Sequence, residues 1–232
     1  MELIHNVYSS NTGINFHHTL TPIDQIAKKK ANTSHAHPQF EIYYLVKGEV
    51  IYIFGGKQYK IEPGSLLLVN AFVYHDTIIK PSCDYERYVV EFTLDYIPTI
   101  NGVSPLFYFF EKRHSLAMIE KAVVDQTNIL EILKDIEKAT LENSPYVAHM
   151  ILGNILRLLA TIGNIKSSIS AVYPVKNVTY KSKNDLYINE AIQYITANID
   201  KKIKVDDIAR HVCISRSYLQ HIFKDHIGES LT

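Results

Sequence analysis

The sequence predicts an α+β fold in which a small β-barrel is followed only by helices. Short segments rich in Ile, Val, Tyr and Phe fill the first half and alternate with glycine-containing turns, as is typical of barrels and sandwiches. From about Ser115 onward, apolar residues recur at helical spacing instead. With 47% hydrophobic and 21% charged residues, the 232-residue chain can bury the core of one large domain or two modest ones.

Turn signals divide the first half into five predicted strands. Three residue pairs that favour turns separate them, namely Lys47-Gly48, Gly55-Gly56 and Pro63-Gly64. The second pair suits a tight hairpin, because both glycines tolerate positive φ. The predicted strands span residues 40–46, 50–54, 58–61, 66–69 and 88–94.

Two antiparallel helices are predicted after the barrel, within residues 127–162. Pro145 suits the first position of the second helix, with Ser144 as its N-cap. The apolar stripe of that helix is wide enough for two neighbours, the barrel and a second chain. Burial within one chain is the alternative interpretation, and we expect a homodimer through these helices.

The C-terminal part is helical again, and a predicted linker separates it from the barrel. Residues 167–183 lack a clear period and contain a serine pair, a proline and several lysines. Three apolar stripes at helical spacing follow. We therefore expect a barrel and dimerisation domain over 1–166, a linker over 167–183 and a helical unit over 184–232.

Residues that carry chemistry cluster at the start of the predicted barrel. His35, His37 and Glu41 are separated by even numbers, so the strand period places them on one face, which Tyr43 continues. His75 follows one hairpin later as a fourth candidate. Imidazoles and a carboxylate on facing strands can form a metal site with open positions, suited to zinc, iron, nickel or manganese.

The spacing of these residues resembles a known family. The pattern His-x-His-x-x-x-Glu, followed after six residues by Gly48, resembles the first motif of the cupin superfamily. A Pro-Gly turn and the later His75 resemble the second motif less closely, since Ser65 stands where an Asp is usual. The resemblance covers about residues 35–94 and implies a double-stranded β-helix barrel.

Three interpretations of the polar cluster remain open. It can hold a divalent transition metal, it can bind a small polar ligand without metal, or it is a hydrogen-bonded structural cluster. Tyrosine rings nearby can stack on sugar rings, so a sugar is the favoured ligand class. The candidate metal ligands are His35, His37, Glu41 and His75. The candidate ligand-binding residues are these four together with Tyr43, Tyr52 and Tyr74.

Residues 204–224 have the layout of a helix-turn-helix. A first helix over 205–211 contains Ala209, which is small enough for a second helix to pack closely. Ser215 is placed to cap the second helix. The outward face of that helix combines base-reading and phosphate-binding side chains, as a major-groove helix requires. These candidate DNA-binding residues are Arg216, Ser217, Gln220, His221 and Lys224. A packing unit with a solvated polar face is the alternative.

The C-terminal string also resembles a known family. Residues 214–219, Ile-Ser-Arg-Ser-Tyr-Leu, resemble the first helix-turn-helix of the AraC/XylS family of regulators. That family often joins a cupin-like sensor, a helical hairpin for dimerisation and this unit, and all three parts occur here in that order. The resemblance implies a DNA-binding transcription regulator that responds to a small effector.

The same resemblance assigns roles on the second helix. Ser217, Gln220 and His221 take base-contacting positions, and Arg216 and Lys224 take phosphate-contacting ones. His221 replaces an Arg that is often found there, so its base contact would be weaker or pH-dependent.

The family's DNA-binding domain also has a second helix-turn-helix, so a truncated DNA-binding unit with weak DNA affinity is expected. The charge balance over 184–232, six Lys and Arg against seven Asp and Glu, agrees with weak binding.

Other features narrow the function class. Cys83 and Cys213 give neither a disulfide framework nor zinc spacing. No apolar run approaches the ~20 residues of a membrane span, and no secretory signal is evident, so a cytoplasmic protein without a membrane partner is expected. Without a phosphate loop or a nucleophile elbow, we expect no enzyme. The alternative is a metal-binding cupin, a metal sensor or a metal-dependent enzyme, with a vestigial or truncated DNA-binding domain.

Overall fold

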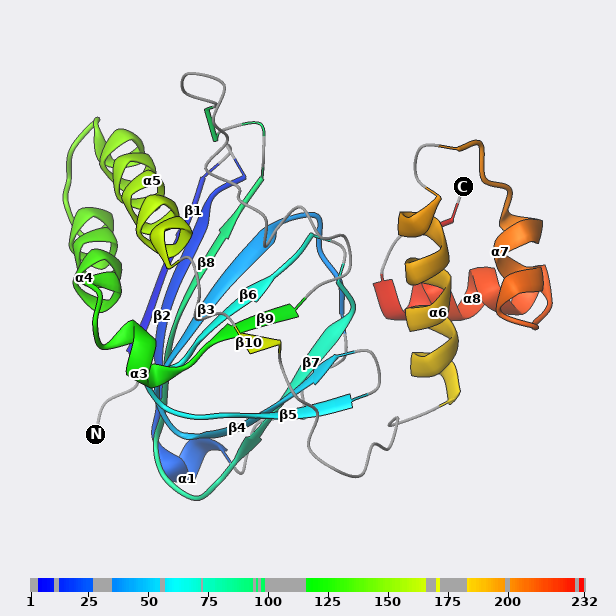
Figure 1. Ribbon diagram of the computed structural model, residues 1–232, viewed down its shortest axis with the longest axis horizontal. Helices are drawn as coiled ribbons and strands as arrows, with labels where there is room; N and C mark the ends of the chain where they lie inside the picture. The colour runs from blue at the N-terminus through cyan, green and yellow to red at the C-terminus, as the bar shows by residue number, and fades with distance from the viewer. Residues whose placement is uncertain are drawn as a thin grey trace.

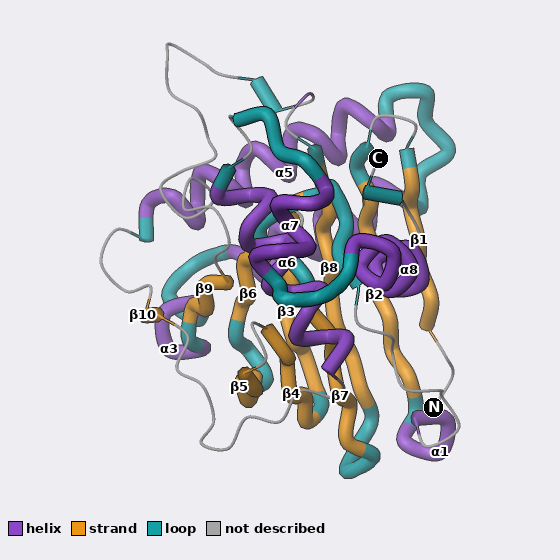
Figure 2. Tube along the Cα trace, turned by 90° about the vertical axis from the view of Figure 1, so that its right-hand side faces the viewer, coloured by secondary structure: helices purple, strands orange, loops and turns teal. Residues whose placement is uncertain are grey.

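The computed structural model shows a β-barrel with a helical hairpin on one side and a helical unit on the other (Figure 1). Figure 2 views the molecule from the side of the helical unit, which lies in front of the barrel strands. The residues described are 4–10, 13–26, 35–54, 57–71, 73–93, 95, 97–98, 116–165, 170–171, 183–198, 201–227 and 230–231.

A large antiparallel sheet forms one wall of the barrel. Its strands are β1 (Ile4–Ser9), β2 (Asn15–Thr21), β3 (Phe40–Lys47), β6 (Leu66–Val69), β8 (Tyr85–Phe92), β9 (Leu116–Ile119) and β10 (Ser170–Ala171). They lie in the order β1-β2-β8-β3-β6-β9-β10. On the central strands, Glu41 lies opposite Glu91 and Tyr43 opposite Val89. Side chains of paired residues point to the same side of a sheet, so these four share the inward face.

A smaller sheet closes the barrel. Its strands β4 (Glu49–Phe54), β5 (Lys57–Ile61) and β7 (His75–Lys80) lie in the order β5-β4-β7, and the short helix α1 (Ile23–Ile26) precedes β3. Apolar and tyrosine side chains from both sheets, including Tyr43, Leu45, Val50 and Tyr52, fill the interior between them. Both sheets therefore contribute to one core inside the barrel.

The helical hairpin covers the outer face of the large sheet. The short helix α3 (Lys121–Val124) leads into α4 (Ile129–Thr140) and α5 (Val147–Asn164), whose apolar faces pack on the outward residues of β2, β3, β6 and β8. Among the described helices, α5 is long and apolar enough to cross a membrane. Its residues Ile151, Ile155 and Leu158 lie fully buried in this core. The helix therefore serves as a core helix of the barrel domain.

A buried histidine joins the sheet to the hairpin. The two ring nitrogens of His18 on β2 lie 3.0 Å from Glu86 of β8 and 2.5 Å from Glu137 of α4. The Tyr88 ring stacks on His18, and its hydroxyl donates to the other oxygen of Glu137 at 3.0 Å. These polar contacts hold α4 in register on the sheet.

The helical unit consists of α6 (Lys183–Ala197), α7 (Val205–His211) and α8 (Arg216–Ile227). Ala191 of α6 packs with Ile208 and Ala209 of α7 and with Leu219 of α8. A second cluster joins this unit to the barrel, because Tyr74 and Ala36 of the barrel pack with Ile188, Ile192, Ile222 and Phe223. The two parts of the chain are thus connected by side-chain packing as well as by the chain itself.

Most of the predicted strands are confirmed. The strands predicted over 40–46, 50–54, 58–61 and 66–69 match β3, β4, β5 and β6 closely, and 88–94 matches the later part of β8. The Gly55-Gly56 turn lies outside the described residues. Strands β1, β2, β7, β9 and β10 were not predicted from the sequence. Strands such as β2 and β7 are rich in His, Asn, Asp and Thr, so their composition hides the usual strand signal.

The helical predictions need two corrections. α5 begins at Val147, so Pro145 precedes the helix, and Ser144 is not its N-cap; the Ser144 hydroxyl accepts instead from the backbone N–H of Tyr146 at 3.2 Å. Within the predicted linker, Ser170–Ala171 forms β10 against β9, and Lys183 already begins α6. The other residues of 167–183 lie outside the described part of the chain.

Candidate functional site

An irregular segment before β3 carries two of the predicted site histidines. His35 and His37 do not belong to a strand, contrary to the expectation that the strand period would align them with Glu41. Instead, His35 forms an isolated antiparallel bridge with His75, the first residue of β7, through two backbone hydrogen bonds of 3.0 and 2.9 Å. The bridge brings the segment across the barrel opening.

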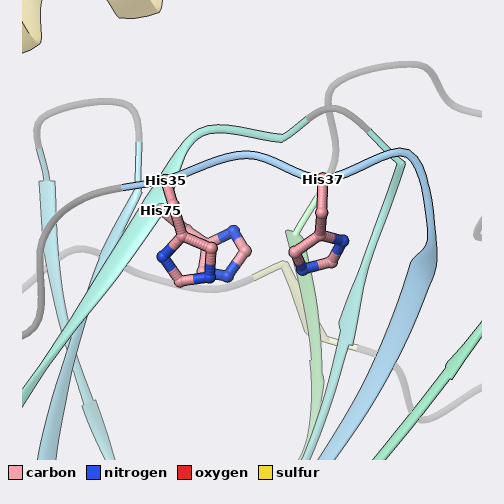
Figure 3. Close-up of side chains that lie close together, drawn as sticks. All are labelled: His35, His37 and His75. Carbon is pink, nitrogen blue, oxygen red and sulfur yellow. The ribbon is translucent and has the colours of Figure 1, made fainter. Parts of the chain in front are cut away.

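The three histidine side chains meet at this opening. Figure 3 shows that the rings of His35, His37 and His75 extend to the same side of their backbone segments, toward the strands of the barrel. The ring centroids of His35 and His75 are 4.5 Å apart, and those of His37 and His75 are 5.3 Å apart. The nitrogens that could bind an ion all lie within 4.8 Å of one another.

Glu41 lies at the centre of the cluster and is only 6% exposed. One of its oxygens accepts a hydrogen bond from the Tyr52 hydroxyl at 3.2 Å. The other lies 3.2 Å from Nε2 of His37 and 3.6 Å from Nε2 of His75. The four predicted residues lie near one another, but the ligand atoms that come within 4.8 Å of each other form two groups, the three histidines and His37 with Glu41 and Glu91. The predicted four come from two separate strands and an irregular segment.

The surroundings of the cluster shift the pKa values of its members in different directions. Burial alone would raise the pKa of Glu41, but the His37 hydrogen bond and the neighbouring positive charges outweigh it and hold the pKa at about 2. Burial lowers the pKa of His75 to about 4. Burial also acts to lower the pKa of His37, yet contact with Glu41 raises it above the ordinary value. At neutral pH the cluster therefore holds an ionised carboxylate beside a neutral His75.

Backbone carbonyls fix which nitrogen of each ring carries a proton. Nδ1 of His75 lies 2.8 Å from the Val73 carbonyl oxygen, and Nδ1 of His37 lies 3.0 Å from the Gln39 carbonyl oxygen. A carbonyl oxygen only accepts hydrogen bonds, so each Nδ1 must donate. Each Nε2 is then directed at Glu41, where it can hold a second proton, a ligand hydrogen bond or a cation.

A cavity of about 330 Å³ opens beside the cluster. Of the seven predicted ligand residues, His35, Glu41, Tyr52 and His75 line it. Five further lining residues were not predicted, namely His17, Thr77, Arg87, Val89 and Glu91. Strand alternation could have revealed three of them, because Arg87, Val89 and Glu91 are spaced by two on β8.

Two predicted tyrosines do not line the cavity. Tyr43 is fully buried beneath Tyr52, with ring centroids 6.0 Å apart, and its hydroxyl lies 3.1 Å from that of Tyr85. Tyr74 packs against α6 and α8 rather than facing the cavity, which corrects its predicted place. Because Tyr74 immediately precedes His75, adjacent residues of one segment point to opposite sides.

Two helices joined by a short turn occupy the segment in which a helix-turn-helix is predicted. α7 spans the predicted residues 205–211, and the hydroxyl of Ser215 accepts from the backbone N–H of Tyr218 at 3.2 Å, as an N-cap should. In the turn, Cys213 adopts φ 59°, a left-handed conformation that is uncommon for a residue with a side chain. Leu219 and Ile222 of α8 are buried, as expected.

All five predicted DNA-binding residues lie on α8 and avoid its core face. Arg216, Ser217, His221 and Lys224 are exposed, and Gln220 is half-buried. Two of them have acidic partners, since Arg216 lies 3.2 Å from Asp206 and His221 lies 3.3 Å from Asp225. The helix thus presents a continuous polar face, and part of its positive charge is balanced within the chain.

The chain matches one family model and several curated regulators. Residues 17–159 match the family model of the AraC-like ligand-binding domain. The transcriptional regulatory protein HptR of Staphylococcus aureus is 30% identical over 109 residues, which cover 44% of this chain and 39% of HptR. The HTH-type transcriptional regulator ArgR of Pseudomonas aeruginosa is 38% identical over 55 residues, covering 24% of this chain and 16% of ArgR. The chain therefore spans well under half the length of either relative.

The matched solved structures include ToxT from Vibrio cholerae with a bound unsaturated fatty acid. It is 11% identical, with a TM-score of 0.46, and the match covers 96% of this chain and 95% of ToxT. The AraC-like transcriptional activator CuxR is also 11% identical, with a TM-score of 0.41, and the match covers 96% of this chain and 74% of CuxR. The family-model match alone spans more than half of the sequence, and this chain therefore belongs to the AraC family of ligand-binding transcription regulators.

Proposed function

We propose that this protein is a cytoplasmic, DNA-binding regulator, and not an enzyme, whose barrel cavity binds a small polar metabolite. The observation that carries the proposal is that two short segments each contribute both to the histidine cluster and to the packing against the helical unit. His35, His37 and His75 face the cluster, while the intervening Ala36 and the adjacent Tyr74 pack on the helical unit. A ligand that shifts either segment therefore acts on α6 and α8 through direct contacts.

The coupling is a shift between two arrangements of the same chain. A ligand changes such an equilibrium only by its different affinity for the two states. The His35–His75 bridge offers a basis for that difference, because a ligand bound between the rings fixes both segments relative to each other. Tyr74 contacts the buried face of α8, so the DNA-reading side chains on the opposite face remain accessible in either state.

The lining of the cavity favours a ligand rich in hydrogen-bonding groups. Glu41 and Glu91 can accept from hydroxyls, and Thr77 and the imidazoles can donate or accept. The Tyr52 ring stacks on His75 at a centroid distance of 5.3 Å and forms an aromatic wall. A sugar or a related polyol fits this combination best.

A metabolite screen by thermal shift tests this proposal. We expect at least one class of polar compound to raise the melting temperature of the wild type but not of Glu41→Gln, which loses the negative charge and has a donor NH2 group in place of one acceptor oxygen. Each compound that binds is then added to a selection from randomised duplex DNA. An unchanged set of selected sequences and unchanged affinity would contradict a regulatory role.

The second candidate function is metal binding at the same cluster, held by His35, His37, Glu41 and His75. The arrangement of His75 favours it, since its Nδ1 donates to Val73 while its Nε2 lies 3.6 Å from a carboxylate oxygen. In neutral His75 two lone pairs then face each other, which a divalent cation between them would relieve. Histidine ligands of metals typically have such a carbonyl partner on the other nitrogen. A bound ion would supply a charged centre for ligand hydroxyls.

Elemental analysis of protein purified without chelator decides between the two candidates. About one transition metal per wild-type chain, absent from His75→Ala, would establish the metal site. His221→Ala, which removes an exposed histidine on α8, serves as the control and should leave the metal content unchanged. No metal in any of the three proteins would exclude this candidate and leave the organic-ligand pocket.

The partners of the regulator follow from its surfaces. We propose that α8 enters the major groove through Arg216, Ser217, Gln220, His221 and Lys224. We also propose a homodimer through the hairpin within residues 127–162, because Leu141, Tyr146 and Met150 are exposed there at 72%, 66% and 38%. Sedimentation analysis tests the dimer, and Met150→Glu should shift it toward monomer.

A further inference from the structure

Arg87 is the one cavity-lining arginine among the described residues, and none of the predicted roles involves it. It lies on β8, opposite Leu45 of β3 and Thr19 of β2, on the face that points into the barrel. Its guanidinium carbon lies 5.7 Å from the ring centroids of both Tyr43 and Tyr85. Two aromatic rings therefore hold the guanidinium in place beside the cavity.

The guanidinium is incompletely paired within the chain. Its Nε is buried without a hydrogen-bond partner, and none of the ion pairs between described residues includes Arg87. Tyr85 does not supply a negative charge, because burial raises the pKa of its phenol above the ordinary value. An arginine stays protonated in proteins, so a full positive charge faces the cavity.

The charges of the cavity are separated along β8. Arg87 and Glu91 both point inward, and their backbones are four residues apart, which is about 14 Å along the strand at ~3.4 Å per residue. Glu91 lies opposite Glu41, so the acidic residues gather with the histidines at the opening. The Arg87 backbone lies further along β8, and its charge helps to lower the pKa of Glu41 although no ion pair joins the two side chains. A ligand in the cavity therefore meets both hydrogen-bond acceptors and a cation.

We infer that the effector carries an anionic group, a carboxylate or a phosphate, which binds Arg87, and hydroxyl groups that bind Glu41 and Glu91. This inference rests on the proposed function and specifies the ligand class of the same cavity. Guanidinium pairs with both anions through two parallel N–H···O bonds, so the shared chemistry is an oxyanion on a hydroxylated metabolite. Arg87 is then the residue that determines specificity for charge.

Matched pairs of an anion and its neutral counterpart test the inference. The probes are gluconate against sorbitol and glycerol 3-phosphate against glycerol, measured by thermal shift and calorimetry alongside a metabolite library sorted by charge. We expect bound compounds to be predominantly anions. Arg87→Gln should weaken their binding at least about 30-fold, the effect of removing one partner of a buried charge pair. Arg87→Lys should retain part of the affinity, and Arg210→Gln, at an exposed arginine of α7, should change nothing.

The outcomes separate this inference from the proposed function. Binding of neutral members as tight as that of their anions, or anion binding that survives in Arg87→Gln, overturns the inference and leaves the barrel as an effector site. A library in which no compound binds the wild type overturns both. Preference for gluconate over glycerol 3-phosphate identifies a carboxylate, and the reverse identifies a phosphate. If Arg87→Gln does not fold, the wild-type comparison of anion and neutral member decides alone.

Discussion

A histidine paired with a carboxylate occurs in both regions of the molecule, buried in the barrel and exposed on the helical unit. His37 and Glu41 in the barrel and His221 and Asp225 on α8 are each a histidine and an acid four residues apart, with Nε2 to oxygen distances of 3.2 and 3.3 Å. The barrel pair is 16% and 7% exposed, and the helical pair is 68% and 58% exposed. Water screens the second pair, whereas the first interacts in a medium of low polarity.

The comparison shows where binding chemistry is built into this chain. The barrel buries its polar groups and orients them with backbone carbonyls, which suits tight recognition of a small ligand. The helical unit leaves its polar groups exposed and pairs some of them with acids, which suits a surface that meets a partner in solution.

Removal of the acid should show the largest difference between the regions. Glu41→Ala leaves the buried His37, His75 and Tyr52 without their common partner and should destabilise the fold by roughly 3–5 kcal/mol. Asp225→Ala removes the exposed acid and should cost less than about 0.5 kcal/mol. Urea denaturation followed by tyrosine fluorescence measures both. Equal losses for the two variants would contradict the contrast.

Acidification should destabilise the barrel through His75. Its pKa is lowered to about 4 in the folded chain, so the unfolded chain binds the proton first as the pH falls. Stability from this group is therefore complete above the unfolded pKa of about 6.5 and is lost between about pH 6.5 and 4, by roughly 3 kcal/mol. Chelator-treated wild type should lose more stability over this range than His75→Asn. Parallel pH profiles would show that His75 is not responsible.

Tyr74→Ala should loosen the contact between barrel and helical unit. The Tyr74 side chain is 6% exposed, so its removal should weaken the packing of the helical unit on the barrel by about 2 kcal/mol. Amides in α6 and α8 should then exchange roughly 30-fold faster. Tyr59→Ala is the matched control, because Tyr59 is also 6% exposed but packs inside the barrel. The prediction is wrong if both variants change exchange in α6 and α8 alike.

DNA binding should show the smallest effects. The described helical unit balances Arg216 with Asp206, so we expect affinity for duplex DNA no tighter than about micromolar at physiological salt. Arg216→Ala should weaken binding to all sequences similarly and reduce the salt dependence by about one counterion. Fluorescence anisotropy measures both, with Arg157→Ala on α5 as control. Tight, sequence-specific binding by this chain would contradict the expectation.

The sequence predicted more of the strands, turns and helices than of the residues that line the cavity. The Gly48 turn, the alternation of β3 residues between the two cores and the Ser215 cap are local signals, and the structure agrees with them. The position of Tyr74 was not predictable, because adjacent residues of an irregular segment have no fixed alternation. Arg87 was missed because the predicted strand began at residue 88, whereas β8 begins at Tyr85, so the alternation that aligns Arg87 with Val89 and Glu91 was not followed back to it.

Hydrogen exchange with and without a compound that binds the barrel tests the central claim most directly. The claim is that a ligand at the histidine cluster acts on the helical unit through Ala36 and Tyr74. We predict that such a compound changes amide exchange in α6 and α8 of the wild type, and that Tyr74→Ala binds it but no longer transmits the change. Exchange that changes only in the barrel strands of the wild type would contradict the claim.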